Sequence, residues 1–193
     1  MGLDSYLNKM PRYKATKAKT VSAIESYFEW QKAKEENKPY ADCTFEKWCG
    51  VKNIPPQDKI DFYKQFYTKK YPTWDTEHKY GHKRIMEQVG YWRKANSIHG
   101  WFVKHIQDGE DDCSYHREVT KADLEELLDT CHKVLCNPGL AEELLPTCSG
   151  FFFGDTSYDE YYVKDIEDTM DIITKVLETT DFKTEMIYYI SSW

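Results

Sequence analysis

The chain has 193 residues, a formal net charge of −7 and an aromatic content of 16%. This length suits a single domain with a substantial core, and no run of about 18 apolar residues is present to cross a membrane. The first residues also lack the apolar core of a secretory signal. These features exclude a membrane-spanning or secreted class and predict a folded protein of the cytosol.

The two parts of the chain differ in charge. Residues 1–105 contain 20 Lys and Arg against 12 Asp and Glu, whereas residues 106–193 contain 6 against 21. This asymmetry predicts two unlike electrostatic faces that attract each other within the fold or between copies, or a basic part that attracts an anionic ligand. We therefore expect a homo-oligomer. An extended nucleic acid is not an expected partner, because the acidic part would repel a long phosphate backbone.

In the N-terminal part the pattern predicts a strand and then helices. Residues 3–7 alternate as a short strand does, and Pro11 closes it. Helices are expected over residues 20–36, over 44–50 with Thr44 as the cap, and from Pro55 onward. We interpret residues 8–84 as a basic, partly helical insert between the first two strands of a single domain, residues 1–193.

The C-terminal part alternates strands and helices. Strands are expected over residues 84–90, 149–154 and 186–193, the second of them central because its three Phe side chains would point to both faces of the sheet. Helices are expected from about Gly90 to Ile106, after Thr120 with Asp123 as a capping box, and after Ser157 with Glu160. The order of elements predicts an α+β fold, with a small mixed or antiparallel sheet of about four strands packed with helices.

The expected helix after Gly90 begins with charges of the wrong sign. A helix N-terminus favours a Ser, Thr, Asp or Asn cap and acidic residues because its free N–H groups are partly positive, yet this one offers Arg93 and Lys94. A bound phosphate or carboxylate would accept from those N–H groups and from both cations, and a base could stack on the neighbouring rings. The candidate ligand-binding residues are Tyr91, Trp92, Arg93, Lys94, Asn96 and His99.

The same residues also have a structural interpretation. Trp92 would lie in the core, and Arg93 and Lys94 would pair with acids of the loop at residues 108–112. His99 would be a packed histidine rather than a ligand contact. Both interpretations stay open on the sequence alone.

Other chemistry finds little support in the sequence. The phosphate loop GxxxxGK[ST], the GxGxxG fingerprint and the GxSxG elbow are absent. His78 and His82 form an HxxxH without a following carboxylate, and the loop at 108–112 resembles a calcium loop but has Cys113 and Val119 where Gly and Glu are required. Six cysteines without a CxxC pair are expected to be buried free thiols. We expect no catalytic residue, no metal and no cofactor.

Six motifs occur together along the chain. They are GLDSYL, GYWRKANSIHGWF, QDGEDDC, LLPTCSGFFFG, YDEYY and the terminal SSW. In this combination the chain resembles a family of uncharacterised proteins encoded by bacteriophages and prophages, over its first seven residues and most of residues 85–193. The resemblance implies a phage accessory protein in the cytoplasm of a bacterial host.

Two functional hypotheses follow. The first is a counter-defence protein that binds and sequesters a small phosphorylated ligand, such as a cyclic nucleotide immune signal, without catalysis. The second is a protein that inhibits a host defence enzyme, for example a CRISPR or other nuclease effector, through its acidic half. Metal-assisted hydrolysis of a nucleotide by the acidic loop is the least supported activity.

Overall fold

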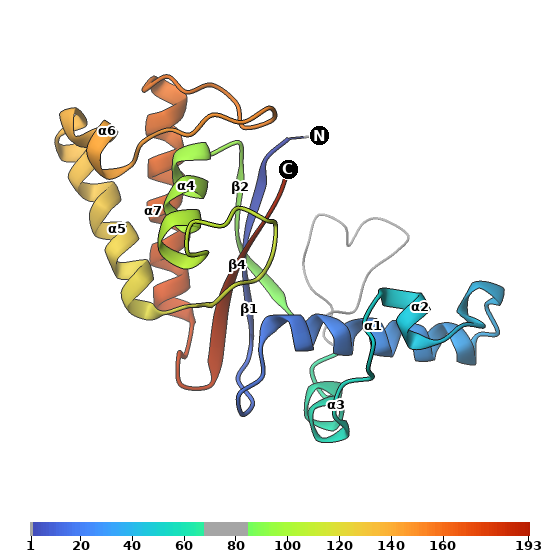
Figure 1. The fold of residues 1–193 in the computed structure, drawn as a ribbon. Coiled ribbons are helices and arrows are strands. Elements are labelled where there is room, and N and C mark those ends of the chain that lie inside the picture. Colours follow the sequence, from blue (N-terminus) through green and yellow to red (C-terminus); the bar gives the residue numbers. More distant parts are fainter. Residues whose placement is uncertain (1, 68–84) are drawn as a thin grey trace. The chain divides into compact units, whose positions relative to one another are not determined.

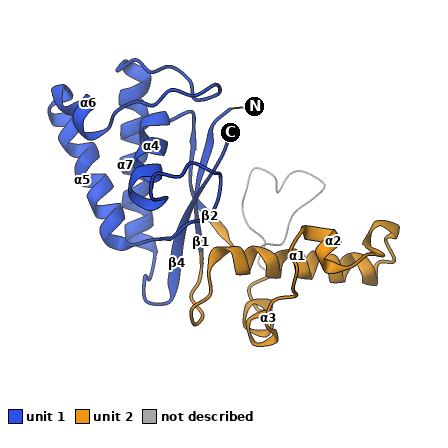
Figure 2. Ribbon diagram, viewed as in Figure 1, with its two compact units in different colours: residues 1–9, 88–193 blue, residues 10–87 orange. Residues whose placement is uncertain are grey.

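The protein divides into two compact units (Figure 2). The computed structural model describes residues 2–67 and 85–193. The sheet unit comprises residues 1–9 and 88–193, and the insert unit comprises residues 10–87. No helix in the described part of the chain combines the length and the apolarity needed to cross a membrane.

Four strands and a set of helices make up the described structure (Figure 1). The strands are β1 (Asp4–Pro11), β2 (Glu87–Arg93), β3 (Glu118–Val119) and β4 (Glu185–Ser192). The insert unit carries α1 (Ala18–Glu35), α2 (Phe45–Cys49), α3 (Gln57–Lys64) and the 3-10 turn η1 (Pro39–Ala41). The sheet unit carries α4 (Asn96–Ile106), α5 (Lys121–Cys136), the 3-10 turn η3 (Pro138–Leu140), α6 (Ala141–Leu144) and α7 (Glu160–Thr179).

The strands form one antiparallel sheet in the order β2–β1–β4–β3. Between β1 and β4, the Tyr189 hydroxyl donates to Ser5 Oγ at 3.0 Å. Between β3 and β4, Glu118 lies opposite Tyr188. At the end of β2, Lys94 N donates to Leu3 O at 2.8 Å. The sheet is therefore built from segments far apart in the sequence, and it confirms the predicted α+β fold.

The core of the sheet unit lies between the sheet and helices α4, α5 and α7, which gather on one of its sides (Figure 1). Each helix turns an apolar stripe inward, as its 3.6-residue periodicity predicts. Fully buried members include Leu7 of β1, Phe102 of α4, Leu127 of α5, Ile166 of α7 and Tyr189 of β4. The rings of Phe102 and Tyr189 stack with centroids 4.1 Å apart.

Several local predictions are confirmed. In the insert unit, Thr44 caps α2 by accepting from Lys47 N, and Gly50 ends it in the left-handed region at φ 74°. In the sheet unit, Thr120 and Asp123 form the predicted capping box at the start of α5. Short polar motifs of this kind are read correctly from sequence because all their partners lie within one turn.

The predicted helix start after Gly90 is wrong. Residues 87–93 form the edge strand β2, and α4 begins only at Asn96. Between them, Lys94 adopts the left-handed region at φ 62°, which reverses the chain direction. The aromatic pair Tyr91 and Trp92 alternates between exposed and buried, as strand residues do.

The predicted central strand at residues 149–154 is also wrong. This segment is a loop, in which Phe153 N donates to Gly150 O and Gly154 has φ 93°. Phe151 is 94% exposed, and only Phe153 is buried. The short strand β3, which the sequence analysis did not predict, forms the fourth strand instead.

The cap of α7 differs from the prediction as well. Asp159, rather than Ser157, is the cap, and its carboxylate accepts from the backbone N–H groups of Tyr161 and Tyr162. Ser157 N instead donates to Asp155 at 2.7 Å. The local sequence offers three possible capping side chains, those of Asp155, Ser157 and Asp159, and the last of them caps the helix.

The six cysteines are free thiols, but only Cys131 is buried, so the expected burial is wrong for the others. The HxxxH of His78 and His82 lies outside the described residues. Within residues 2–67 and 85–193, no three His, Cys, Asp or Glu side chains gather in a way that could hold a metal ion.

Candidate functional site

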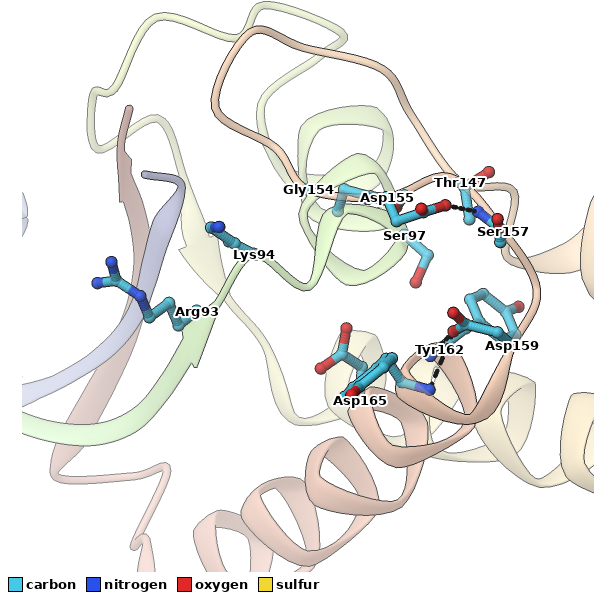
Figure 3. Close-up of a pocket in the computed structure, with 12 residues that line it drawn as sticks. Arg93, Lys94, Ser97, Thr147, Gly154, Asp155, Ser157, Asp159, Tyr162 and Asp165 are labelled. Atoms are coloured by element: carbon cyan, nitrogen blue, oxygen red, sulfur yellow. Dashed lines mark hydrogen bonds between the residues drawn. The ribbon is translucent and has the colours of Figure 1, made fainter. Parts of the chain in front are cut away.

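A pocket of about 290 Å³ opens in the sheet unit, where three distant segments meet (Figure 3). These segments are the end of β2 with the start of α4, the loop before α7, and the first two turns of α7. They carry three of the six motifs, GYWRKANSIHGWF, LLPTCSGFFFG and YDEYY. We call this cavity the bipolar pocket, because its opposite sides carry opposite charge.

The cationic side comes from the junction of β2 and α4. Arg93 and Lys94 are exposed here, and α4 follows with no side-chain cap and no acidic residue in its first turn. The helix start is therefore uncapped, but it lies at Asn96, so Arg93 and Lys94 precede the helix and do not belong to its first turn. Lys94 is a non-glycine residue in the left-handed region, a conformation that costs about 1 kcal/mol and is concentrated at functional sites.

The acidic side comes from the loop before α7 and from α7 itself. Figure 3 shows the carboxylates of Asp155, Asp159 and Asp165 on this side, with Arg93 and Lys94 at the other end and their charged groups directed away from the carboxylates. Two of the three carboxylates are occupied by backbone N–H groups. The third, Asp165, has no hydrogen-bond or ion-pair partner among the described residues.

Asp165 is therefore the unusual acid of the pocket. Burial, together with the nearby negative charges of Asp168 and Asp159, raises the pKa of its carboxyl to about 6. By contrast, hydrogen bonds from Ser157 lower the pKa of Asp155. A half-buried carboxylate without a donor favours a ligand that supplies one, such as a hydroxyl or an amino group.

Asn96 and Ser97 form the floor between the two sides. Asn96 is 5% exposed, and its amide donates to Phe153 O at 3.2 Å and to Asp155 O at 2.7 Å. Its side-chain oxygen accepts from Cys148 N at 3.1 Å. Asn96 thus holds the loop that carries part of the acidic side, and it positions the pocket rather than offering free polar atoms to a ligand.

Tyr91 and Arg93 lie on the outer side of β2. The Tyr91 hydroxyl donates to Asp4 Oδ1 at 2.6 Å, and Arg93 Nη1 lies 3.3 Å from the same oxygen. Arg93 therefore pairs with Asp4 and not with the loop at residues 108–112. The ammonium group of Lys94 has no hydrogen-bond or ion-pair partner among the described residues, so it is available to a ligand.

Trp92 and His99 belong to the core and do not line the pocket. Trp92 is 4% exposed and its indole N–H donates to Thr169 Oγ1 at 2.9 Å. His99 is 1% exposed and lies in a buried chain of hydrogen bonds that we call the His99 chain. The chain runs from Asp111 to His99 Nε2 (3.0 Å), from His99 Nδ1 to the Tyr189 hydroxyl (2.7 Å), and on to Ser5 (3.0 Å).

The candidate residues thus separate into two groups. The structure brings Arg93, Lys94 and Asn96 to one pocket, and it places Tyr91, Trp92 and His99 elsewhere. Sequence reasoning missed the residues of the acidic side and the floor, which are Ser97, Thr147, Asp155, Asp159, Tyr161 and Asp165. The sequence held no clear signal for Asp165, because it lies beside the buried stripe of α7 and not within it.

No family model, no curated protein and no solved structure matches the chain. The fold and the pocket alone therefore define the class, which is an α+β protein with a pocket of mixed charge.

Proposed function

We propose that the protein binds and sequesters a small phosphorylated ligand of nucleotide type, without catalysis. The observation that carries this proposal is the bipolar pocket, in which an uncapped helix start and Lys94 lie at one end and the unpartnered carboxylate of Asp165 lies at the other. A nucleotide has matching ends, since its phosphate is an anion and its ribose and base carry hydroxyl and amino donors.

In this arrangement the phosphate lies at the mouth of the pocket, near Lys94 and Arg93. Exposed side chains of this length change rotamer on the picosecond to nanosecond scale, so both can turn toward an anion. The free N–H groups at the start of α4 add a partial positive charge on the same side. The hydroxyl or amino groups of the ligand donate to Asp165 within the pocket.

The size of the pocket narrows the ligand class. Small-molecule sites usually occupy about 300 to 1,000 Å³, and the volume of about 290 Å³ lies at the lower end of that range. The pocket therefore favours a mononucleotide over a dinucleotide. Tyr161, which is 73% exposed at the rim, offers a ring on which a base can stack.

The resemblance to phage-encoded proteins supports the biological setting. Three of the motifs that carry it line the bipolar pocket. A cyclic mononucleotide that acts as an immune signal in the cytoplasm of a bacterial host is then the proposed ligand, and its removal from solution is the counter-defence activity. Sequestration needs only enclosing contacts and no catalytic group.

A calorimetric titration of the full chain with cyclic mononucleotides, linear mononucleotides and cyclic dinucleotides tests this proposal. We expect one of the mononucleotides to bind, and chromatography of the mixture to recover it unchanged. If no member of the panel binds, the proposal is lost. A chemically altered product would instead favour metal-assisted hydrolysis.

A second candidate function is inhibition of a host defence enzyme through the acidic half. It is favoured by exposed carboxylates on the helices that cover the sheet, among which Glu142 and Glu143 of α6 have no partner among the described residues. Such a surface could imitate nucleic acid in a basic channel. Pull-down from a host lysate would have to recover a defence protein, and the double change Glu142→Lys, Glu143→Lys would have to weaken that capture.

A further inference from the structure

The two edges of the sheet are protected to different degrees. The edge strand β3 has two residues, whereas the other edge, β2, has seven. An exposed edge strand is a template for pairing with another chain, and proteins usually prevent this with short strands, charges or prolines. Residues 88–92 of β2 contain none of these features. This edge is therefore suited to pair with another strand.

The backbone of β2 presents alternate residues to its open edge. Lys94 N donates to Leu3 O, toward β1, and a Cβ added at Gly90 would lie 3.2 Å from Leu7 Cβ of β1. These two contacts fix the register between β1 and β2. Because the direction of backbone groups alternates along a strand, Val89 and Tyr91 direct their N–H and C=O groups away from β1. These groups face the open edge.

An open hollow of about 360 Å³ runs along the same edge, between β2 and α7. Its lining includes Gly90 of β2 and Asp171, Ile172 and Lys175 of α7. A Cβ at Gly90 would lie 2.8 Å from Ile172 Cγ2, so glycine lets the strand and the helix approach each other closely. Asp171 and Lys175 have no ion-pair partner among the described residues, although they carry opposite charges.

We propose that β2 pairs with β2 of a second copy of the chain, antiparallel and around a two-fold axis at Gly90. In that register Val89 lies opposite Tyr91 of the second copy, and the pair is repeated by symmetry. Both residues direct their backbone groups to the open edge, as a hydrogen-bonded antiparallel pair requires. A β-branched residue opposite an aromatic one is also a favourable cross-strand pair.

The charges of this edge favour a second copy over an unrelated strand. In a dimer with a two-fold axis, the same patch of both copies meets in opposite directions. Such a patch must therefore be complementary to itself. The edge meets this condition, because the axis near Ile172 brings Lys175 of each copy toward Asp171 of the other.

Sedimentation of the full chain across micromolar concentrations tests the pairing, which is independent of any ligand. We expect a dimer for the unaltered chain and a monomer for Val89→Pro. Proline at this position removes only an N–H group that faces outward, which an edge strand tolerates without loss of its fold. Circular dichroism checks that Val89→Pro stays folded.

A charge exchange gives a second test that does not disturb the strand. Asp171→Lys places like charges together and should raise the dissociation constant about tenfold, because the contact occurs twice in the dimer. The exchanged variant Asp171→Lys, Lys175→Asp should regain the affinity of the unaltered chain. Asp129→Lys, the same change on α5, is the matched control and should have no effect.

Two results would overturn the proposal. One is an unaltered chain that stays monomeric throughout the concentration range. The other is a dimer that persists unchanged in Val89→Pro and in Asp171→Lys, since the interface would then lie elsewhere.

Discussion

Two polar clusters include residues of α4, and they differ in how their polar groups are satisfied. Each member of the His99 chain has a hydrogen-bond partner, and Trp193 closes the chain by donating to Asp111 at 2.9 Å. In the bipolar pocket, the Asp165 carboxylate and the Lys94 ammonium group have no hydrogen-bond or ion-pair partner among the described residues. Buried polar groups that are satisfied stabilise a fold, whereas unsatisfied ones at a cavity are kept for a ligand.

The largest expected effect is on the His99 chain. His99→Ala leaves the Tyr189 hydroxyl and one Asp111 oxygen without their present partner and also opens a cavity, so it should lower the free energy of unfolding by about 3 kcal/mol. Urea denaturation followed by circular dichroism measures this. His132→Ala, at an exposed position of α5, is the control and should change stability by less than about 0.5 kcal/mol.

Asn96 belongs to the satisfied group although it lines the pocket. Asn96→Ala removes both hydrogen bonds that hold the loop at residues 153–155, and it leaves the buried carbonyl group of Phe153 unpaired. We expect a loss of about 2 kcal/mol in the free energy of unfolding. Asn53→Ala, in an exposed loop, should leave stability unchanged by the same measurement. Equal losses of stability in the two variants would show that the hydrogen bonds of Asn96 do not stabilise the loop.

Lys94 belongs to the other group, and its removal should affect binding without loss of stability. Lys94→Ala should weaken nucleotide affinity about tenfold, the loss expected for one charged contact to a phosphate. Lys104→Ala is the matched control, because Lys104 is an exposed cation on α4 that lies outside the bipolar pocket. Calorimetry compares the two variants, and equal affinities would contradict the assignment.

Removal of the Asp165 carboxylate should raise the stability of the fold but lower the affinity for the ligand. Its folded pKa of about 6 lies above the unfolded value of about 3.9, so the folded state binds more protons between these values. The contribution of Asp165 to the free energy of unfolding therefore falls as the pH rises from about 4 to about 6. At neutral pH, Asp165→Asn should stabilise the protein by about 1 kcal/mol, a value reduced for partial solvent screening, and should weaken binding.

The pH profile checks this sign directly. Thermal unfolding midpoints of the unaltered chain and of Asp165→Asn should converge near pH 4 and separate as the pH rises to 7. A constant difference across this range would show that the carboxylate of Asp165 is not the cause.

The sequence predicts those parts of the fold whose partners are close in the chain. Thr44 with Gly50 and Thr120 with Asp123 are of this kind, and both were correct. The segment from Gly150 to Gly154 was predicted as a strand because three adjacent Phe residues suggest burial. In the structure its two glycines allow a turn, and β3 takes the place in the sheet. Such competition between distant segments is not encoded in a local pattern.

The candidate site was predicted in part for the same reason. The cations Arg93 and Lys94 stood out because they contradict a local rule for helix starts. Their counterparts Asp155 and Asp165 lie about 60 to 70 residues further on, and only the tertiary fold brings them to the same pocket. His99 and Trp92 belong to the same motif as the cations, but their positions on α4 and β2 direct their side chains into the core.

The most direct test of the central claim is a calorimetric titration of the full chain with a cyclic mononucleotide at neutral pH, repeated with Lys94→Ala and with Asp165→Asn. The account predicts that the unaltered chain binds one ligand per pocket and that each variant loses about tenfold in affinity while remaining folded. Binding that is unaffected by both substitutions, or no binding to the unaltered chain, would contradict it.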